Sequence, residues 1–161
     1  MIAVTLKAVF DRARLPAGER RTTFVYIDEA SEYLDANVAQ LLIQSRKFGC
    51  GLVLALQSVS QIPLPLRDLV MANTSIKLAG GVSAKDARYL AAELQTTADF
   101  ILSAKKNSRS TCFAAYVRNQ TPTATRMQVP FLTLERMPRM SDAQFQEVLA
   151  RNRQEVSGGM G

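Results

Sequence analysis

Thr23-Phe24-Val25-Tyr26-Ile27-Asp28-Glu29 joins a run of β-favouring residues to a pair of carboxylates. A continuous apolar run of this kind is typical of a strand that is buried on both faces of a parallel sheet. The abrupt change to acidic residues places Asp28 and Glu29 at the carboxyl end of that strand. Because ligands of open parallel sheets bind beyond the carboxyl ends of the strands, the two carboxylates are candidate site residues.

The sequence on either side of this strand predicts alternating helices and strands. Upstream, the apolar spacing within residues 1–14 is that of an amphipathic helix. Downstream, a helix that Asp35 or Asn37 can cap leads to a second buried strand, Leu52–Leu56, and a third strand, Ser75–Ala79, follows a short helix. This order predicts an α/β protein with a mainly parallel sheet flanked by helices.

The pattern changes after the third strand. Ser83, with Asp86 three residues later, predicts the capping box of a further helix. Two strand-like segments, Thr111–Val117 and Thr123–Val129, are separated by a turn that contains Pro122. Together they predict an antiparallel hairpin at the edge of the sheet.

A second, small region follows at the end of the chain. Ser141 with Gln144 predicts the start of a last helix, and residues 157–161 predict a flexible tail. The sequence is therefore divided into a main α/β part, residues 1–140, and a helix with a tail, residues 141–161.

Composition limits the possible chemistry. With 161 residues, 47% of them hydrophobic and 21% charged, the chain is a globular domain and not a disordered or disulfide-rich one. The absence of His excludes Ser-His and Cys-His pairs and removes the commonest zinc ligand. Cys50 and Cys112 belong to no metal-binding motif and are expected to be small core residues.

The first ten residues bear on where in the cell the chain acts. Residues 1–10 do not have the pattern of a secretory signal, so we expect a cytoplasmic protein, or one at the inner face of the cytoplasmic membrane.

The net charge is +6, and the basic excess lies in the second half of the chain. This half predicts either a nucleic-acid-binding patch or a solvated basic face without a partner; the candidate residues are Lys105, Lys106, Arg109, Arg118 and Arg126.

The Asp-Glu pair after an apolar strand is the pattern called Walker B. The first carboxylate can hold the water shell of Mg²⁺, and the second can polarise an attacking water. Gln57 ends the neighbouring strand, where its amide could contact a γ-phosphate and the attacking water. Arg46 lies near the end of the helix between the two strands and could reach a phosphate on a neighbouring subunit.

The spacing of these segments resembles the hexameric DNA-pumping ATPases of the HerA and FtsK class, and most of all the coupling proteins of type IV secretion and conjugation systems. The segments that carry the resemblance are Val25–Ala30, Arg46–Gln57, Ile76-Lys77 and Gly80-Gly81. The resemblance covers residues 22–139 and implies a RecA-like P-loop NTPase core.

The resemblance implies ATP and Mg²⁺ as cofactors, a ring of identical subunits around DNA, and other components of secretion or conjugation machinery as partners. It makes Asp28 the Mg²⁺-associated carboxylate, Glu29 the catalytic base and Gln57 the γ-phosphate sensor. Arg46 becomes the candidate finger acting on a neighbouring subunit, with Arg67 and Arg88 as alternatives.

The family's phosphate-binding loop, GxxxxGK[ST], is missing, because no Gly in this sequence is followed by Lys. We therefore expect the chain to be the C-terminal half of a motor domain, to bind ATP poorly, and to be inactive without an N-terminal half that carries Walker A. A half sheet also exposes an apolar edge, which predicts self-association. Two other functions stay open: a non-catalytic regulatory or interaction module on the same scaffold, and a basic DNA-binding domain.

Overall fold

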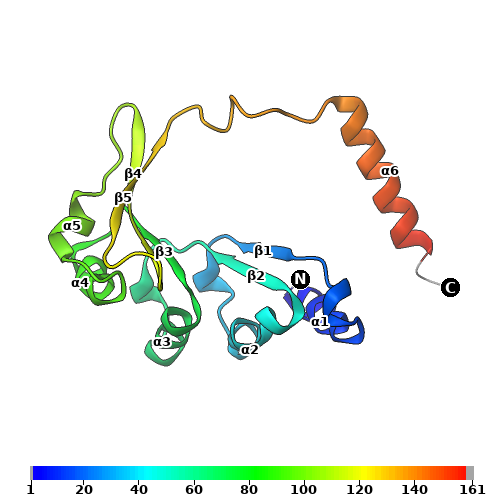
Figure 1. The fold of residues 1–161 in the computed structure, drawn as a ribbon, viewed down its shortest axis with the longest axis horizontal. Helices are drawn as coiled ribbons and strands as arrows, with labels where there is room; N and C mark the ends of the chain where they lie inside the picture. Colours follow the sequence, from blue (N-terminus) through cyan, green and yellow to red (C-terminus); the bar gives the residue numbers. More distant parts are fainter. Residues whose placement is uncertain (1, 159–161) are drawn as a thin grey trace. The chain divides into compact units, whose positions relative to one another are not determined.

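The computed structural model describes residues 2–158 and divides the chain into two compact units, Met1–Val129 and Pro130–Gly161 (Figure 1). The sequence pattern suggested a division after residue 140. Within the second unit, residues 132–141 are all exposed. No helix in the part of the chain that the structure describes is long and apolar enough to cross a membrane.

A parallel pair of strands carries the acidic segment. β1 (Thr23–Ile27) pairs with β2 (Cys50–Leu54) in a register that sets Thr23 beside Cys50 and Ile27 beside Leu54. The connection runs through α2 (Ala36–Gln44), and the Asp35 carboxylate caps this helix by accepting a 3.0 Å hydrogen bond from the Val38 N–H. The predicted strand at β1 and its parallel pairing with the next strand are therefore confirmed.

The second sheet is antiparallel. It contains β3 (Ile76–Ala79), β4 (Ser110–Val117) and β5 (Thr125–Pro130) in that order. β3 pairs antiparallel with β4, with Ile76 beside Val117. The α/β class with a hairpin at the sheet edge is confirmed, while parallel pairing among the described residues is confined to β1 and β2.

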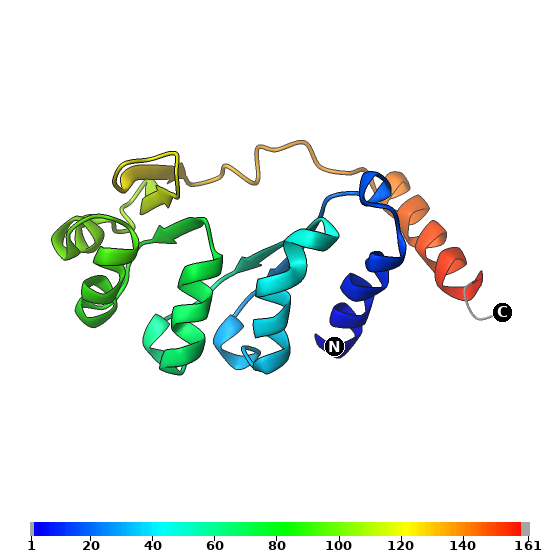
Figure 2. The ribbon, with the colours of Figure 1, turned by 60° about the horizontal axis from the view of Figure 1, so that its bottom comes forward.

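The remaining helices of the first unit are α1 (Ile2–Asp11), α3 (Leu64–Asn73), α4 (Ala84–Glu93) and α5 (Ala98–Ser103). Figure 2 shows α1 to α4 on the same side of the strands. The sequence reading missed α5, although the Thr97 hydroxyl caps it by accepting a hydrogen bond from the Phe100 N–H.

The main hydrophobic core lies between the helices and the strands. Its buried members include Leu94 and Ile101, both with 0% exposure, and Ala79 of β3. A smaller cluster lies under β1 and β2 and includes Leu41. Cys50 and Cys112 are buried and form no disulfide bond, as expected of small core residues.

The expectation that β1 is buried on both faces is wrong. Phe24 is 57% exposed and Tyr26 is 74% exposed, whereas Val25 packs against the smaller core cluster. The reason is that helices cover only one side of the strands (Figure 2).

The second unit contains α6 (Asp142–Gly158). Ser141 and Gln144 form the predicted capping box, since the Ser141 N–H donates to Gln144 Oε1 at 2.9 Å and the Gln144 N–H donates to Ser141 Oγ at 3.3 Å. The flexible tail predicted for residues 157–161 is helical as far as Gly158, and residues 159–161 lie outside the described part of the chain.

Candidate functional site

The carboxyl ends of β1 and β2 meet at one edge of the sheet. Pairing continues beyond the strands: the Ala55 N–H donates to the Ile27 carbonyl at 2.9 Å, and the Ala30 N–H donates to the Ala55 carbonyl at 2.9 Å. These bonds fix the loop after β1 against the loop after β2. The two loops therefore present their polar side chains at the same edge, as the parallel order of the strands predicts.

The structure brings Glu29 and Gln57 into contact. The Gln57 Nε2 donates a hydrogen bond to Glu29 Oε1 at 3.3 Å, and both residues are exposed. The two positions are 28 residues apart in the sequence. A carboxylate and an amide from adjacent strands thus face solvent together, where both can reach a ligand.

The Glu29 backbone is in the left-handed region, with φ of 48°. The Asp28 side chain supports this turn, because its Oδ1 accepts a 2.9 Å hydrogen bond from the Glu29 N–H. A non-glycine residue in this region costs about 1–3 kcal/mol and persists only where the surroundings fix it. Such strain is concentrated at functional sites.

The carboxylates of Asp28 and Glu29 suit a magnesium ion that nucleotide phosphates also coordinate. Among the described residues no group of three His, Cys, Asp or Glu side chains could hold a metal ion. Mg²⁺, however, usually keeps several waters and takes only one or two carboxylates from the protein when it is bound with a nucleotide. Asp28 and Glu29 meet that smaller requirement, and both are exposed.

Arg46 lies at the other end of the strands. It belongs to the 3-10 turn Ser45–Phe48, which precedes the amino end of β2, and it is exposed. Asp28 and Gln57, by contrast, follow the carboxyl ends of β1 and β2. Arg46 therefore does not join the other candidates within one chain.

The two alternative arginines differ in their surroundings. Arg67 is partly buried: its Nη2 donates to the Ile62 carbonyl at 2.9 Å, and its guanidinium lies 5.0 Å from the centre of the Tyr89 ring. Arg88 is exposed on α4 and donates from Nε to the Ala84 carbonyl at 3.2 Å. Arg67 is thus already used to hold α3 and α4 together.

The basic residues of the second half differ in their surroundings. Lys105, Lys106 and Arg109 are exposed around the turn that precedes β4. Arg126 donates to Ser103 Oγ at 2.8 Å and lies 5.7 Å from the centre of the Phe100 ring.

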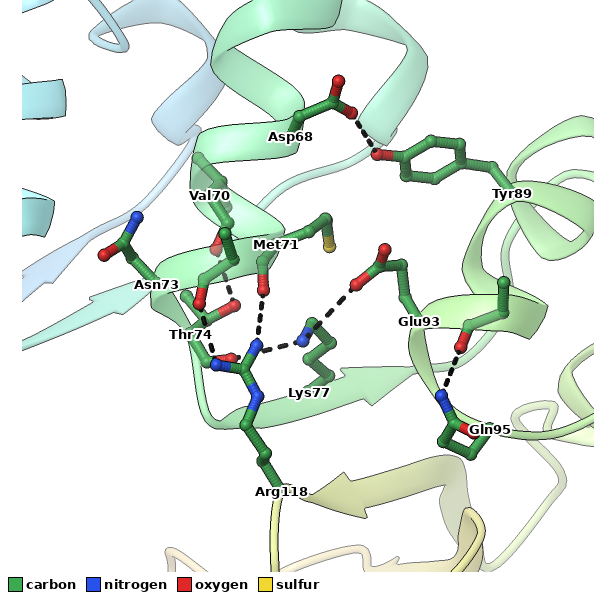
Figure 3. Close-up of polar contacts among 12 residues, drawn as sticks. Asp68, Val70, Met71, Asn73, Thr74, Lys77, Tyr89, Glu93, Gln95 and Arg118 are labelled. Atoms are coloured by element: carbon green, nitrogen blue, oxygen red, sulfur yellow. Dashed lines mark hydrogen bonds and ion pairs between the residues drawn. The ribbon is translucent and has the colours of Figure 1, made fainter.

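Arg118 has a structural role in this fold (Figure 3). Its Nη1 donates to the Ala72 carbonyl at 2.8 Å, and its Nη2 donates to the Met71 carbonyl at 2.9 Å. These carbonyls belong to the last turn of α3, where intrahelical partners are missing and a cation is favourable. The guanidinium is therefore engaged with the helix end, away from the exposed Lys105, Lys106 and Arg109.

Two polar pairs, one between β3 and α4 and the other between α3 and α4, were not predicted from the sequence (Figure 3). Lys77 is 8% exposed, and its Nζ lies 3.5 Å from Glu93 Oε2. Burial lowers the pKa of Lys77, although Glu93 opposes that change. The Tyr89 hydroxyl donates to Asp68 Oδ1 at 3.1 Å, and burial together with this bond raises the pKa of Tyr89 to about 12.

A buried carboxylate lies behind the loop that carries Gln57. Asp86 is 2% exposed, and its Oδ2 accepts a 2.7 Å hydrogen bond from Ser58 Oγ. The Asp86 N–H donates to Ser83 Oγ at 3.1 Å, which confirms Ser83 as the cap of α4. The Asp86 side chain turns to the loop after β2 and so ties the residue next to Gln57 to α4.

Neither a protein-family model nor a curated protein sequence matches this chain. Among solved structures, the unbound bacterial conjugative coupling protein TrwBdeltaN70 matches with a TM-score of 0.58 and 17% identity, over 80% of this chain and 35% of that chain. VirB4 of Thermoanaerobacter pseudethanolicus matches with a TM-score of 0.48 and 18% identity, over 88% of this chain and 38% of that chain.

The chain thus spans little more than a third of the length of the solved structures that it matches. At this level of identity the likeness concerns the fold. The α/β fold expected from the sequence is confirmed, and this chain shares the fold of part of the bacterial conjugative coupling protein TrwBdeltaN70.

Proposed function

We propose that this chain is the water-activating and phosphate-sensing part of an ATPase motor domain in a conjugation or type IV secretion system. The observation that carries the proposal is the 3.3 Å contact between Glu29 and Gln57 at the joint carboxyl end of β1 and β2. The fold that the chain shares with a conjugative coupling protein supports the same conclusion.

Each residue of the proposed site has a chemical role. Asp28 holds the water shell of Mg²⁺, and Glu29 orients and deprotonates the water that attacks the γ-phosphate. The Gln57 amide N–H donates to the Glu29 carboxylate. When ATP is bound, the same amide can turn to a γ-phosphate oxygen, so the contact reports whether the nucleotide is intact.

The groups that bind the β- and γ-phosphates are not part of this sequence. A GxxxxGK[ST] loop would supply both the backbone N–H groups and the lysine for these phosphates. We assign that loop to an N-terminal Walker A half. Accordingly this chain alone binds ATP weakly and turns over little or none.

Arg46 fits a role between subunits. Because it lies at the opposite end of β2 from Gln57, it could act only on the site of a neighbouring copy. This geometry favours a ring of identical subunits in the complete motor, with Arg46 completing the adjacent nucleotide site.

The turn before β4 is the proposed contact with DNA. Lys105, Lys106 and Arg109 are exposed there, and an exposed basic turn can neutralise backbone phosphates without reading sequence. Binding at this turn would weaken steeply as salt is added. A motor with this function would act in the cytoplasm or at the inner face of the cytoplasmic membrane.

The test is Glu29→Gln in the complete motor subunit that contains this chain. We expect ATP turnover to fall by about 10²–10⁴, the usual effect of removing a general base, while nucleotide binding is retained. Glu32→Gln is the matched control, because Glu32 is an exposed glutamate in the next turn and has no role in the proposed site. Unchanged turnover in Glu29→Gln would contradict the proposal and favour a non-catalytic interaction module.

A further inference from the structure

The contact between Glu29 and Gln57 is too weak to place the two side chains by itself. The distance from Gln57 Nε2 to Glu29 Oε1 is 3.3 Å, which is long for a hydrogen bond, and both side chains are exposed to water. An exposed glutamine has many rotamers, and water competes for its amide. The group that keeps the amide near the carboxylate must therefore act on the backbone that carries Gln57.

This backbone is anchored two residues before Gln57. The Ala55 N–H donates to the Ile27 carbonyl at 2.9 Å, and the Ala55 carbonyl accepts from the Ala30 N–H at 2.9 Å. Both bonds hold Ala55 to the loop that carries Glu29. They fix the chain as far as Ala55, so a second anchor is needed on the far side of Gln57.

The second anchor is Ser58, the residue directly after Gln57. Its Oγ donates a 2.7 Å hydrogen bond to Asp86 Oδ2, a length typical of a hydroxyl bonded to a carboxylate. Because the single hydroxyl hydrogen is used there, the same oxygen accepts from the Ser60 N–H at 3.2 Å and from the Ser60 hydroxyl at 2.7 Å. Ser58 therefore begins the 3-10 turn Val59–Gln61 and ties it to α4 through one hydroxyl group.

The turn after Ser58 is itself packed into the protein. Val59 is 7% exposed and Ile62 is 1% exposed. Arg67 of α3 donates from Nη2 to the Ile62 carbonyl at 2.9 Å. The turn is thus held by α4 through Asp86 and by α3 through Arg67, so the chain behind the exposed glutamine is fixed on both sides.

The hydrogen bonds of Asp86 are not those that would best stabilise its own helix. Asp86 is the third residue of α4, where an acidic side chain usually accepts from the N–H of the capping residue, here Ser83. Its Oδ2 instead accepts from Ser58, and its Oδ1 has no hydrogen-bond partner among the described residues, although Asp86 is 2% exposed. A buried carboxylate oxygen without a partner is costly. The stability of α4 alone therefore does not account for an aspartate at this position.

We propose that Asp86 is a positioning residue of the candidate ATPase site: through Ser58 it fixes the backbone of Gln57, so that the Gln57 amide meets Glu29. Asp86 is buried behind the loop and acts on a ligand only through these residues. The expected effect on turnover rests on the proposed function, whereas the effect on the Gln57 side chain does not.

The first measurement is the placement of the Gln57 side chain in the whole chain, followed by NMR without nucleotide. The unchanged protein should show a nuclear Overhauser effect between the Gln57 side-chain amide and the Glu29 side chain. Asp86→Ala and Ser58→Ala should each remove this signal, because either change breaks the anchor. Asp86→Asn and Ser58→Thr should keep it, since an amide oxygen still accepts from the hydroxyl and threonine still supplies one.

The second measurement is ATP turnover by the complete motor subunit that contains this chain. Asp86→Ala should lower kcat by about tenfold and change KM by less than about twofold, because a misplaced group loses its effect in the transition state. In a Gln57→Ala background, Asp86→Ala should cause no further loss. Tyr89→Phe is the matched control: it removes the hydrogen bond from α4 to Asp68 and leaves Ser58 bonded, so kcat should not change (Figure 3).

Three results would overturn the proposal. The first is a Gln57–Glu29 signal that persists in both Asp86→Ala and Ser58→Ala. The second is an equal loss of kcat from Asp86→Ala with and without Gln57, because Asp86 would then act on the fold as a whole. The third is a loss in Tyr89→Phe as large as the loss in Asp86→Ala.

The two measurements also separate this proposal from the proposed function. If Asp86→Ala removes the Gln57–Glu29 signal while Asp86→Ala and Gln57→Ala both leave turnover unchanged, Asp86 does position Gln57. In that case the positioning stands, and the assignment of Glu29 and Gln57 to ATP hydrolysis is the one that fails.

Discussion

The two sheets of the first unit differ in how far the chain itself completes them. The antiparallel sheet β3–β4–β5 covers the core residues Leu94 and Ile101, pairs Lys77 with Glu93, and uses Arg118 to hold the end of α3. The parallel pair β1–β2 packs on the smaller cluster through Val25 and on the main core through Leu52 and Leu54, and it leaves the apolar face of β1 exposed. Stability therefore resides mainly in one sheet, and the candidate chemistry lies at the edge of the other.

This contrast is typical of sites that are completed by a partner. The candidate residues Asp28, Glu29 and Gln57 are all exposed, and Glu29 is held in a strained conformation. A site of this kind needs a rigid neighbour to position it.

The largest predicted effect comes from replacing one buried leucine in each hydrophobic cluster, because the two losses of stability compare the two sheets directly. Leu94 and Leu41 are 0% and 1% exposed. Buried Leu→Ala changes cost about 2–5 kcal/mol, and we expect Leu94→Ala near the top of that range and Leu41→Ala near the bottom. The reason is that the cluster around Leu41 is small and can collapse around the cavity.

Urea denaturation of both variants measures the difference. The unchanged protein and a surface variant such as Gln40→Ala on α2 give the baseline. If Leu41→Ala were the more costly change, β1–β2 and not the antiparallel sheet would be the stable region of the unit.

A smaller effect is expected at the ion pair beneath β3. Glu93→Gln leaves the Lys77 ammonium buried without its counter-charge, so we expect a loss of about 1–3 kcal/mol. Lys77→Met removes the buried charge and keeps a side chain of similar length, so its effect should be close to zero. Burial already disfavours the charged form of Lys77 and lowers its pKa.

The measurement is again the free energy of unfolding, at pH 7 and in parallel for the two variants. Equal losses in both variants would show that the pair itself stabilises the sheet. In that case the order of β3 would depend on the ion pair and not on the apolar core beneath it.

The features that could be predicted from the sequence depend on neighbouring residues or on the order of the strands. The β1 strand and its end at Asp28 follow from a local change in polarity, and the Ser141–Gln144 box follows from capping chemistry. The meeting of Glu29 with Gln57 also follows from sequence, because parallel strands end at the same edge.

The remaining features depend on contacts between distant segments. The exposure of Tyr26 could not be predicted, since an apolar strand has the same sequence whether one face or both are covered. Arg118 was assigned to a basic patch because composition does not show that it meets the end of α3. The inward Lys77 did leave a signal, a single charge in the apolar segment Ile76–Ala79.

The most direct test of the shared β1–β2 site is a double-mutant cycle on Glu29 and Gln57 in the complete motor subunit, with ATP turnover as the readout. Residues that act as one unit show strongly non-additive losses. We predict that Glu29→Gln and Gln57→Ala each reduce turnover and that the double variant is no slower than Glu29→Gln alone. Losses that multiply in the double variant would show that the two residues act independently and would contradict a single site at the joint end of the strands.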